Sequence, residues 1–322
     1  MASEHEISEA VAVLRRGGLV AFPTETVYGL GCDARNLDAL QRLYTVKARP
    51  IDHPVIVHLP GPDHLAAWAS SVPSDAAVLA EACWPGPLTV VVPRAAFVPD
   101  EVTGGRAGVA LRVPDQPVAL ALLRAFDDGV AAPSANRFGR VSPTTAADVR
   151  DDLDDDVDVI LDGGPCAVGV ESTIVDCTEP EPVILRVGGF PKERLEALLG
   201  RPIGLRVDGE RAAPGTFPVH YSPHASVVVV THDELVAEAH ATLASGKRAG
   251  VLALDAPTQL PNGLVVLEAP NDIDDFARVL YARMREADRL GLDVLFAVAP
   301  PECGVGAAVG DRLRRAGGGR PS

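Results

Sequence analysis

Short apolar runs and amphipathic stretches follow one another along the chain in two different patterns. Up to residue 200, apolar runs that favour buried strands are separated at uneven intervals by stretches with helical spacing of their apolar residues. The expected strands span residues 19–22, 55–59, 88–93, 108–114, 157–164, 172–177 and 182–189, and residues 129–136 are expected to be a strand that runs into a polar turn. The expected helices span residues 8–16, 37–46, 63–69, 74–83, 115–126 and 191–199, with one more after Thr144 or Thr145. This uneven mixture predicts an α/β fold with a mixed sheet.

The pattern changes after residue 200. Residues 201–225 are rich in proline, glycine and charge, which indicates a linker, and their length is typical of a functional lid. Beyond them, expected strands at 226–230, 250–254, 264–267 and 293–298 are interspersed with expected helices at 233–245, 272–290 and 305–315. We therefore predict a large domain over 1–200, a linker or lid over 201–225, a small Rossmann-like three-layer α/β domain over 226–316 and a disordered tail over 317–322.

Local signals set the expected ends of the helices. Ser8 can cap the first helix, which Gly17 and Gly18 end, and Ser74 can cap the helix over 74–83. Gly29–Ala34 matches G-x-G-x-x-A, but the motif follows TETVY rather than a strand, so we favour a structural turn over a dinucleotide site.

Composition and charge limit the functional classes and cellular compartments that fit this chain. The 322 residues are 47% hydrophobic with a formal net charge of −15, which argues against a general nucleic-acid or membrane-surface binder. Five cysteines without a CxxC pair favour a reducing compartment. The N-terminus has no cationic start or apolar core, and no apolar run reaches ~18 residues, so we expect a cytoplasmic protein without a membrane span.

Basic residues mark the candidate chemistry. Lys47 and Arg49 follow an expected helix, where they are either solvated or aimed at an anion. Arg112 and Arg186 lie inside apolar strands, where a guanidinium needs a partner or a ligand. The chain contains no P-loop, and we find no convincing nucleophile or histidine pair suited to zinc. A cage of cations for phosphate and carboxylate, acting by positioning and charge neutralisation, is therefore the expected site.

Several segments together resemble a known family. They are FPTETVYGLG (22–31), KARP with HPVIVH (47–58), VALRVP (109–114), APSAN (132–136), GVESTIVD (169–176), ILRVGGF (184–190) and PGTFPVHYSPHA (214–225). The chain resembles the YrdC-type threonylcarbamoyl-AMP synthases in their long form, which carries an extra C-terminal domain. The resemblance implies a YrdC-like twisted mixed sheet with helices and a catalytic domain over 1–200.

The resemblance also implies the reaction and its site. Such enzymes form threonylcarbamoyl-AMP and pyrophosphate from L-threonine, bicarbonate or CO2, and ATP with Mg²⁺, and a downstream tRNA threonylcarbamoyl transferase complex uses the product. Lys47 and Arg49 would be catalytic. The residues implied for L-threonine are Thr26, His58, Arg112, Ala132 and Ser172. The residues implied for ATP are Lys47, Arg49, His53, Gly108, Ser134, Asn136, Ser142, Arg186 and Tyr221. Protein side chains alone would hold no metal.

The sequence departs from the family pattern at a few positions, and two other functions stay open. His53 stands in place of the usual Asn, Gly108 in place of Thr and Val187 in place of Pro. An O-carbamoyltransferase of the same superfamily would use carbamoyl phosphate and ATP. An RNA-binding module would contact tRNA through a basic concave face, which the net charge of −15 disfavours.

Overall fold

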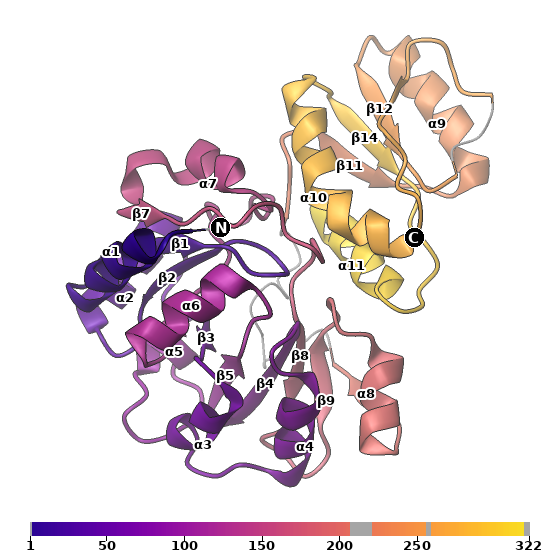
Figure 1. The fold of residues 1–322 in the computed structure, drawn as a ribbon. Coiled ribbons are helices and arrows are strands. Elements are labelled where there is room, and N and C mark those ends of the chain that lie inside the picture. The colour runs from indigo at the N-terminus through magenta and orange to yellow at the C-terminus, as the bar shows by residue number, and fades with distance from the viewer. Residues whose placement is uncertain (1, 207–220, 256–258, 319–322) are drawn as a thin grey trace. The chain divides into compact units, whose positions relative to one another are not determined.

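The computed structural model describes residues 2–206, 221–255 and 259–318 (Figure 1). Within these residues the chain forms two compact units, and each unit is built from segments that are not contiguous in the sequence. The first unit contains the chain up to Phe138 together with Ser142–Ala167 and the stretch that begins at Glu171. The second unit contains the C-terminal part of the chain and also takes in Gly139–Val141 and Val168–Val170.

The first unit is built on one mixed sheet. In the described part of the chain this sheet has ten strands, in the order β10-β9-β8-β4-β5-β3-β6-β2-β1-β7. Their bounds are β1 (Val20–Phe22), β2 (Gly29–Asp33), β3 (Ile56–His58), β4 (Leu88–Pro93), β5 (Gly108–Arg112), β6 (Val130–Ala131), β7 (Val159–Ile160), β8 (Thr173–Asp176), β9 (Val183–Arg186) and β10 (Gly204–Leu205). The sheet contains both parallel pairs, such as β3 with β5, and antiparallel pairs, such as β4 with β5. The predicted mixed α/β fold is confirmed.

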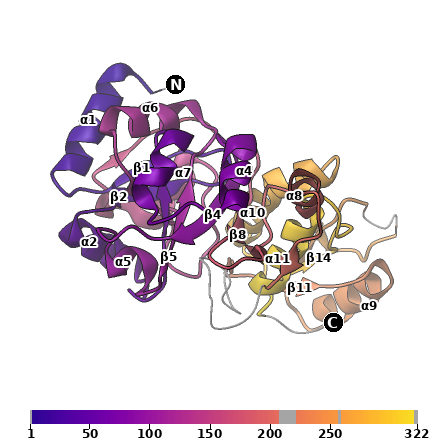
Figure 2. The same cartoon turned by 90° about the horizontal axis from the view of Figure 1, so that it is seen from below.

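Helices cover the sheet unequally. The helical elements of this unit are α1 (Glu4–Arg15), α2 (Leu37–Lys47), η1 (Pro62–His64), α3 (Leu65–Trp68), α4 (Ser74–Cys83), α5 (Asp100–Thr103), α6 (Pro117–Phe126), α7 (Ala146–Leu153), η2 (Asp154–Asp156) and α8 (Lys192–Leu199). Val57 and Leu111 point into the main core with residues of α2 and α4. On the opposite face, α1 and α6 lie side by side and pack on Phe22 and Val130 (Figures 1 and 2).

A part of that second face carries only a small apolar cluster. It consists of Ile56, Ala110, Ile174 and Leu185, which come from β3, β5, β8 and β9. Since side chains two residues apart on a strand share a face, His58 and Arg112 lie on this same face. This is where the candidate site is found.

Three local predictions were wrong. The first helix begins at Glu4 and is capped by Ser3, whose side chain and that of Glu6 form a capping box; the prediction at Ser8 missed this S-x-x-E signal. Ser74 is the first residue of α4, after Pro73, and not its cap. Residues 29–31, expected in a turn, belong to β2, where Gly31 leaves room for a ring: a Cβ there would lie 2.7 Å from Phe22 Cε1.

The second unit contains a parallel sheet, as predicted. In the described residues its four strands lie in the order β11-β14-β12-β13 and all pairs are parallel. The elements are β11 (Ser226–Val229), α9 (His232–Ala244), β12 (Ala249–Leu252), β13 (Val265–Val266), α10 (Ile273–Arg289), β14 (Val294–Ala297) and α11 (Gly306–Ala316). Residues 207–220 of the predicted lid and 319–322 of the predicted tail lie outside the described residues. No described helix has the length and apolar character needed to cross a bilayer.

Candidate active site

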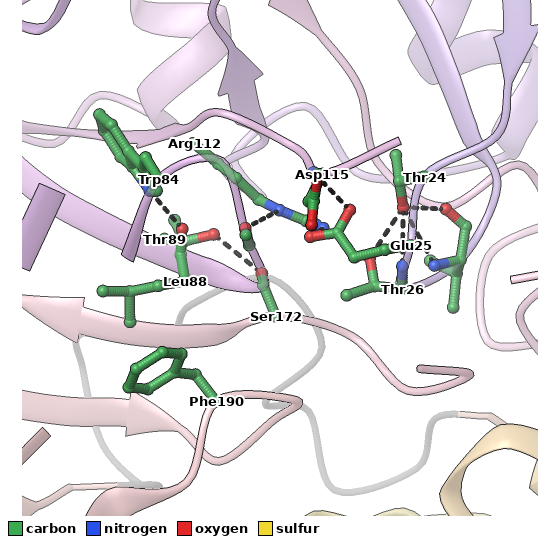
Figure 3. Close-up of polar contacts among 12 residues, drawn as sticks. Thr24, Glu25, Thr26, Trp84, Leu88, Thr89, Arg112, Asp115, Ser172 and Phe190 are labelled. Carbon is green, nitrogen blue, oxygen red and sulfur yellow. Dashed lines mark hydrogen bonds and ion pairs between the residues drawn. The ribbon is translucent and has the colours of Figure 1, made fainter. Parts of the chain in front are cut away.

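A row of polar side chains crosses neighbouring strands of the large sheet (Figure 3). His58 at the end of β3 is in register with Arg112 at the end of the parallel strand β5. In β4, Thr89 Oγ1 lies 2.8 Å from Ser172 Oγ, just before β8. In β9, Arg186 donates from Nη2 to Ser172 Oγ at 3.1 Å and from Nε to the Ser172 carbonyl oxygen at 3.0 Å. The row therefore joins residues assigned to threonine with one assigned to ATP.

Glu25 completes this row and was missed by sequence reasoning. Its Oε1 lies 2.7 Å from Arg112 Nη2, with both side chains buried, while its Oε2 accepts from the Asp115 backbone N–H at 3.0 Å. Arg112 also donates from Nε to the Gly86 carbonyl oxygen at 3.2 Å. One feature of the sequence could have identified Glu25. A buried arginine needs a carboxylate as its partner, and Glu25 is the acidic residue in the hydroxyl-rich segment after the first strand.

Hydroxyl groups fix the segment that presents Glu25. Thr24 Oγ1 accepts from the backbone N–H groups of Thr26 and Val27 at 3.2 Å each and donates to the Val27 carbonyl oxygen at 2.6 Å. Thr26 Oγ1 lies 2.8 Å from Thr24 Oγ1 (Figure 3). Thr26, assigned to threonine from the sequence, is therefore held in the same short segment as Glu25, the residue before it, which pairs with Arg112.

Three buried polar atoms in this region lack a hydrogen bond among the described residues. They are Glu25 Oε1, Arg112 Nη2 and His58 Nδ1; the first two form their ion pair without the alignment of a hydrogen bond. Burial, and after it the positive charge of Arg112, lowers the pKa of His58 to about 3, so its ring is neutral at physiological pH. An unsatisfied buried polar group costs about 1–3 kcal/mol, so His58 Nδ1 suits a hydrogen bond with a small polar ligand, while Glu25 and Arg112 satisfy each other's charge.

Lys47 anchors the loop that follows β6. It is the last residue of α2, and its buried Nζ donates to the carbonyl oxygens of Ser134 and Asn136 at 2.5 Å each. Its own carbonyl oxygen accepts from the Phe138 N–H at 2.8 Å. Burial, and after it the charge of Arg49, lowers the pKa of Lys47 well below its ordinary range. The Lys47 side chain thus fixes Ser134 and Asn136, the two residues that were assigned to ATP from the sequence.

Arg49 and His53 flank the same loop. Arg49 donates from Nη2 to the Pro54 carbonyl oxygen at 2.9 Å, and its guanidinium carbon lies 5.5 Å from the centre of the Phe138 ring. The His53 ring centre lies 5.3 Å from that of Phe138, and burial, followed by the charge of Arg49, lowers the pKa of His53. Lys47, Arg49 and His53 are thereby gathered around residues 134–138.

The remaining predicted residues of the first unit lie at strand ends and loops. Ser142 is buried and donates to Glu171 Oε1 at 2.7 Å, which connects it to the residue before Ser172. Ala132 donates its backbone N–H to the Ile56 carbonyl oxygen at 2.9 Å. Gly108 opens β5 opposite Pro93, and a Cβ there would lie 2.8 Å from Val91 Cγ1, so a larger residue would require local movement.

Tyr221 belongs to the second unit. Its ring is buried and stacks on that of Tyr281 with centres 5.8 Å apart, and the Arg312 guanidinium carbon lies 4.9 Å from its centre. The described residues contain no group of three or more His, Cys, Asp or Glu side chains suited to a metal ion.

Comparisons with known proteins agree over the whole chain. A family model described as "Telomere recombination" (Sua5_yciO_yrdC) matches residues 12–188, and one described as "Threonylcarbamoyl-AMP synthase, C-terminal domain" matches residues 190–318. The threonylcarbamoyl-AMP synthase of Pyrococcus abyssi is 40% identical over 98% of this chain and 95% of its own length. That of Bacillus subtilis is 39% identical over 99% of this chain and 94% of its own length.

A solved structure agrees in fold. The crystal structure of Sua5 from P. abyssi complexed with L-threonine has a TM-score of 0.93 at 39% identity, covering 99% of this chain and 96% of that one. Both domains of the family are therefore present, in order and nearly at full length. The chain belongs to the family of threonylcarbamoyl-AMP synthases, in the long form that carries the additional C-terminal domain.

Proposed function

We propose that this chain forms threonylcarbamoyl-AMP and pyrophosphate from L-threonine, bicarbonate or CO2, and ATP. The observation that carries the proposal is a buried cation, a buried carboxylate and a neutral polar ring in one place: Arg112 and Glu25 form an ion pair at 2.7 Å, and His58, in register with Arg112, has an Nδ1 atom without a hydrogen bond among the described residues. An amino acid with a side-chain hydroxyl offers one cation, one anion and one neutral polar group, which is the complementary set. The P. abyssi relative, which shares this fold, was crystallised as a complex with L-threonine.

The threonine carboxylate would pair with Arg112, whose guanidinium has Nη atoms beyond its bond to the Gly86 carbonyl oxygen. The amine would face Glu25, and the hydroxyl would bond to the neutral His58 ring. The hydroxyl groups of Thr26 and Ser172 would form further hydrogen bonds with the threonine, and Ala132 would contact it through its backbone. The buried setting strengthens each of these contacts, because the local dielectric constant is low.

The ATP would bind around the loop that Lys47 fixes. Lys47, Arg49 and Arg186 would offset phosphate charge, and Ser134, Asn136 and Ser142 would donate to phosphate or ribose, with His53 and Gly108 beside them. The family resemblance also assigns Tyr221, a residue of the second unit, to ATP binding. Mg²⁺ would be bound chiefly through the triphosphate oxygens, as it is in many ATP-dependent enzymes, and would supply further neutralisation of charge.

The reaction needs no covalent intermediate on the protein. The threonine amine attacks CO2 to form a carbamate with release of a proton. A carbamate oxygen then attacks the α-phosphorus, and the bond from that phosphorus to the β-phosphate oxygen breaks to release pyrophosphate. Lys47 and Arg49 would stabilise the charge that grows on the phosphates, and the buried face would protect the labile product from water. A tRNA threonylcarbamoyl transferase would consume the product.

Pyrophosphate release from ATP tests this function. We expect release by the purified chain only when both L-threonine and bicarbonate are present, with formation of the mixed anhydride seen by mass spectrometry. Release that depends on carbamoyl phosphate instead would identify an O-carbamoyltransferase. Salt-sensitive binding of tRNA without any turnover would identify an RNA-binding module.

A further inference from the structure

Two short segments leave the first unit and pack within the second. Gly139–Val141 and Val168–Val170 are separated in sequence by 26 residues of the first unit, Ser142–Ala167, and both belong to the second unit. The long helix of that unit, α10, contacts each segment in a different way (α10 is labelled in Figure 1). The two segments therefore both pack against α10.

Backbone and side-chain contacts hold the first segment. The Gly139 carbonyl oxygen accepts from the Ser222 N–H at 2.9 Å, and Arg140 forms a parallel bridge with Ser222. Arg285 of α10 donates from Nη2 to the Val141 carbonyl oxygen at 2.7 Å. This last bond fixes the residue immediately before Ser142.

The second segment touches the backbone of α10 through a glycine. Gly169 has a φ of +79°, and a Cβ at this position would lie 2.4 Å from Arg278 Cα and 2.5 Å from the Ala277 carbonyl oxygen. Both the backbone conformation and the close approach therefore require glycine. Two residues later the chain returns to the first unit at Glu171.

The two segments re-enter the first unit at residues that bond to each other. Ser142 follows Val141, Glu171 follows Val170, and the Ser142 hydroxyl donates to Glu171 Oε1 at 2.7 Å. Ser172, the next residue, is the one that receives two hydrogen bonds from Arg186. A shift of the first segment is thus transmitted through one peptide bond to Ser142, which is proposed to bind ATP, and a shift of the second segment is transmitted through Glu171 to Ser172, which is proposed to bind threonine.

We propose that the C-terminal unit positions the synthase site, with Arg285 and Gly169 as positioning residues that hold the two segments on α10. This inference rests on the proposed function for its kinetic consequences, while the anchoring itself can be measured without substrate. Arg285 acts through Val141 on Ser142, and Gly169 acts on Glu171 and Ser172. The additional unit therefore contributes to substrate affinity without supplying catalytic groups of its own on these segments.

The test uses full-length Arg285→Ala, with Arg283→Ala as matched control. Arg283 lies on the same helix, and its described contacts are to Glu268 and Glu286 inside the C-terminal part of the chain. We measure amide hydrogen exchange of residues 139–145 and 168–173, melting temperature, and KM and kcat. Arg285→Ala should speed exchange in the first segment and raise KM for ATP or threonine about threefold to tenfold, the loss expected for one hydrogen bond. The kcat and melting temperature should change little, and Arg285→Lys should restore KM in part.

The outcomes separate the two proposals. Unchanged exchange and unchanged KM in Arg285→Ala would overturn the positioning role, as would an equal effect in Arg283→Ala. Gly169→Ala is an independent test of the second segment. It should speed amide exchange in residues 168–173 regardless of the result for Arg285→Ala, because the contact of Gly169 with α10 does not involve Arg285. If the wild-type chain releases no pyrophosphate, the proposed function fails, while faster exchange in both variants still supports the anchoring.

Discussion

Acid should destabilise the first unit through His58, and the size of the effect follows from its burial. The ring is 3% exposed, and its pKa in the folded chain is about 3 against an ordinary value of 6.5. Between these two values the unfolded chain binds a proton at this ring that the folded chain does not. Stability therefore falls as the pH drops below 6.5, by ~1.4 kcal/mol for each pH unit.

At pH 5 the loss from this one group is ~2 kcal/mol relative to pH 7, a large part of a typical unfolding free energy of about 5–15 kcal/mol. Urea unfolding followed by tryptophan fluorescence would measure it, because Trp68 and Trp84, the two tryptophans of the chain, lie in the core of the first unit. Other groups titrate over the same range, so the quantity to compare is the difference between wild type and His58→Gln.

The variant His58→Gln should be less stable than wild type at pH 7 but should lose ~2 kcal/mol less on going to pH 5. His240→Gln, at an exposed position on α9, should keep the wild-type dependence on pH. Parallel loss of stability in wild type and His58→Gln would refute the reasoning, since it would mean that the folded ring accepts a proton as readily as the unfolded one.

Two substitutions test other parts of the site, and a third tests the packing of β2. Arg112→Ala should raise KM for threonine much more than KM for ATP in initial-rate measurements, and an equal rise would show that the assignment of this side chain is wrong. Glu25→Gln leaves the Arg112 guanidinium buried without its counter-ion and should lower the unfolding free energy by about 3–5 kcal/mol in urea; a loss below about 1 kcal/mol would contradict the buried pair. Gly31→Ala places a Cβ 2.7 Å from both Phe22 Cε1 and Val130 Cγ1, so it should cost about 1–3 kcal/mol in the same assay, and wild-type stability would count against the packing of β2.

Sequence patterns predicted the elements whose signals are local. Periodicity located most strands and helices of both units, including β4 and α4 with their bounds, because strand alternation and helical spacing are properties of a few adjacent residues. The start of α1 was missed because Glu4, His5 and Glu6 carry no apolar signal. The strand β2 was missed because Gly29 and Gly31, which face Phe22, look like turn residues.

Contacts between distant parts of the chain were not predictable in the same way. Arg112 was correctly singled out as a buried cation, but its partner Glu25 lies 87 positions earlier, and nothing local connects the two. Lys47 was expected to be either solvated or aimed at an anion; it is buried, so the first alternative was wrong, and its bonds to the carbonyl oxygens of Ser134 and Asn136 could not be read from the sequence. The membership of Gly139–Val141 and Val168–Val170 in the second unit likewise depends on tertiary packing alone.

The interleaving of the two units limits how the chain can be divided. A fragment that ends at Arg206 retains Gly139–Val141 and Val168–Val170 but loses α10 and Ser222, on which they rest. Val141 and Val170 are 4% and 0% exposed in the full chain. In such a fragment we expect Gly139–Val141 and Val168–Val170 to be exposed to solvent without the contacts that hold them. A fragment that contains the first unit alone should therefore not reproduce the behaviour of the full-length enzyme.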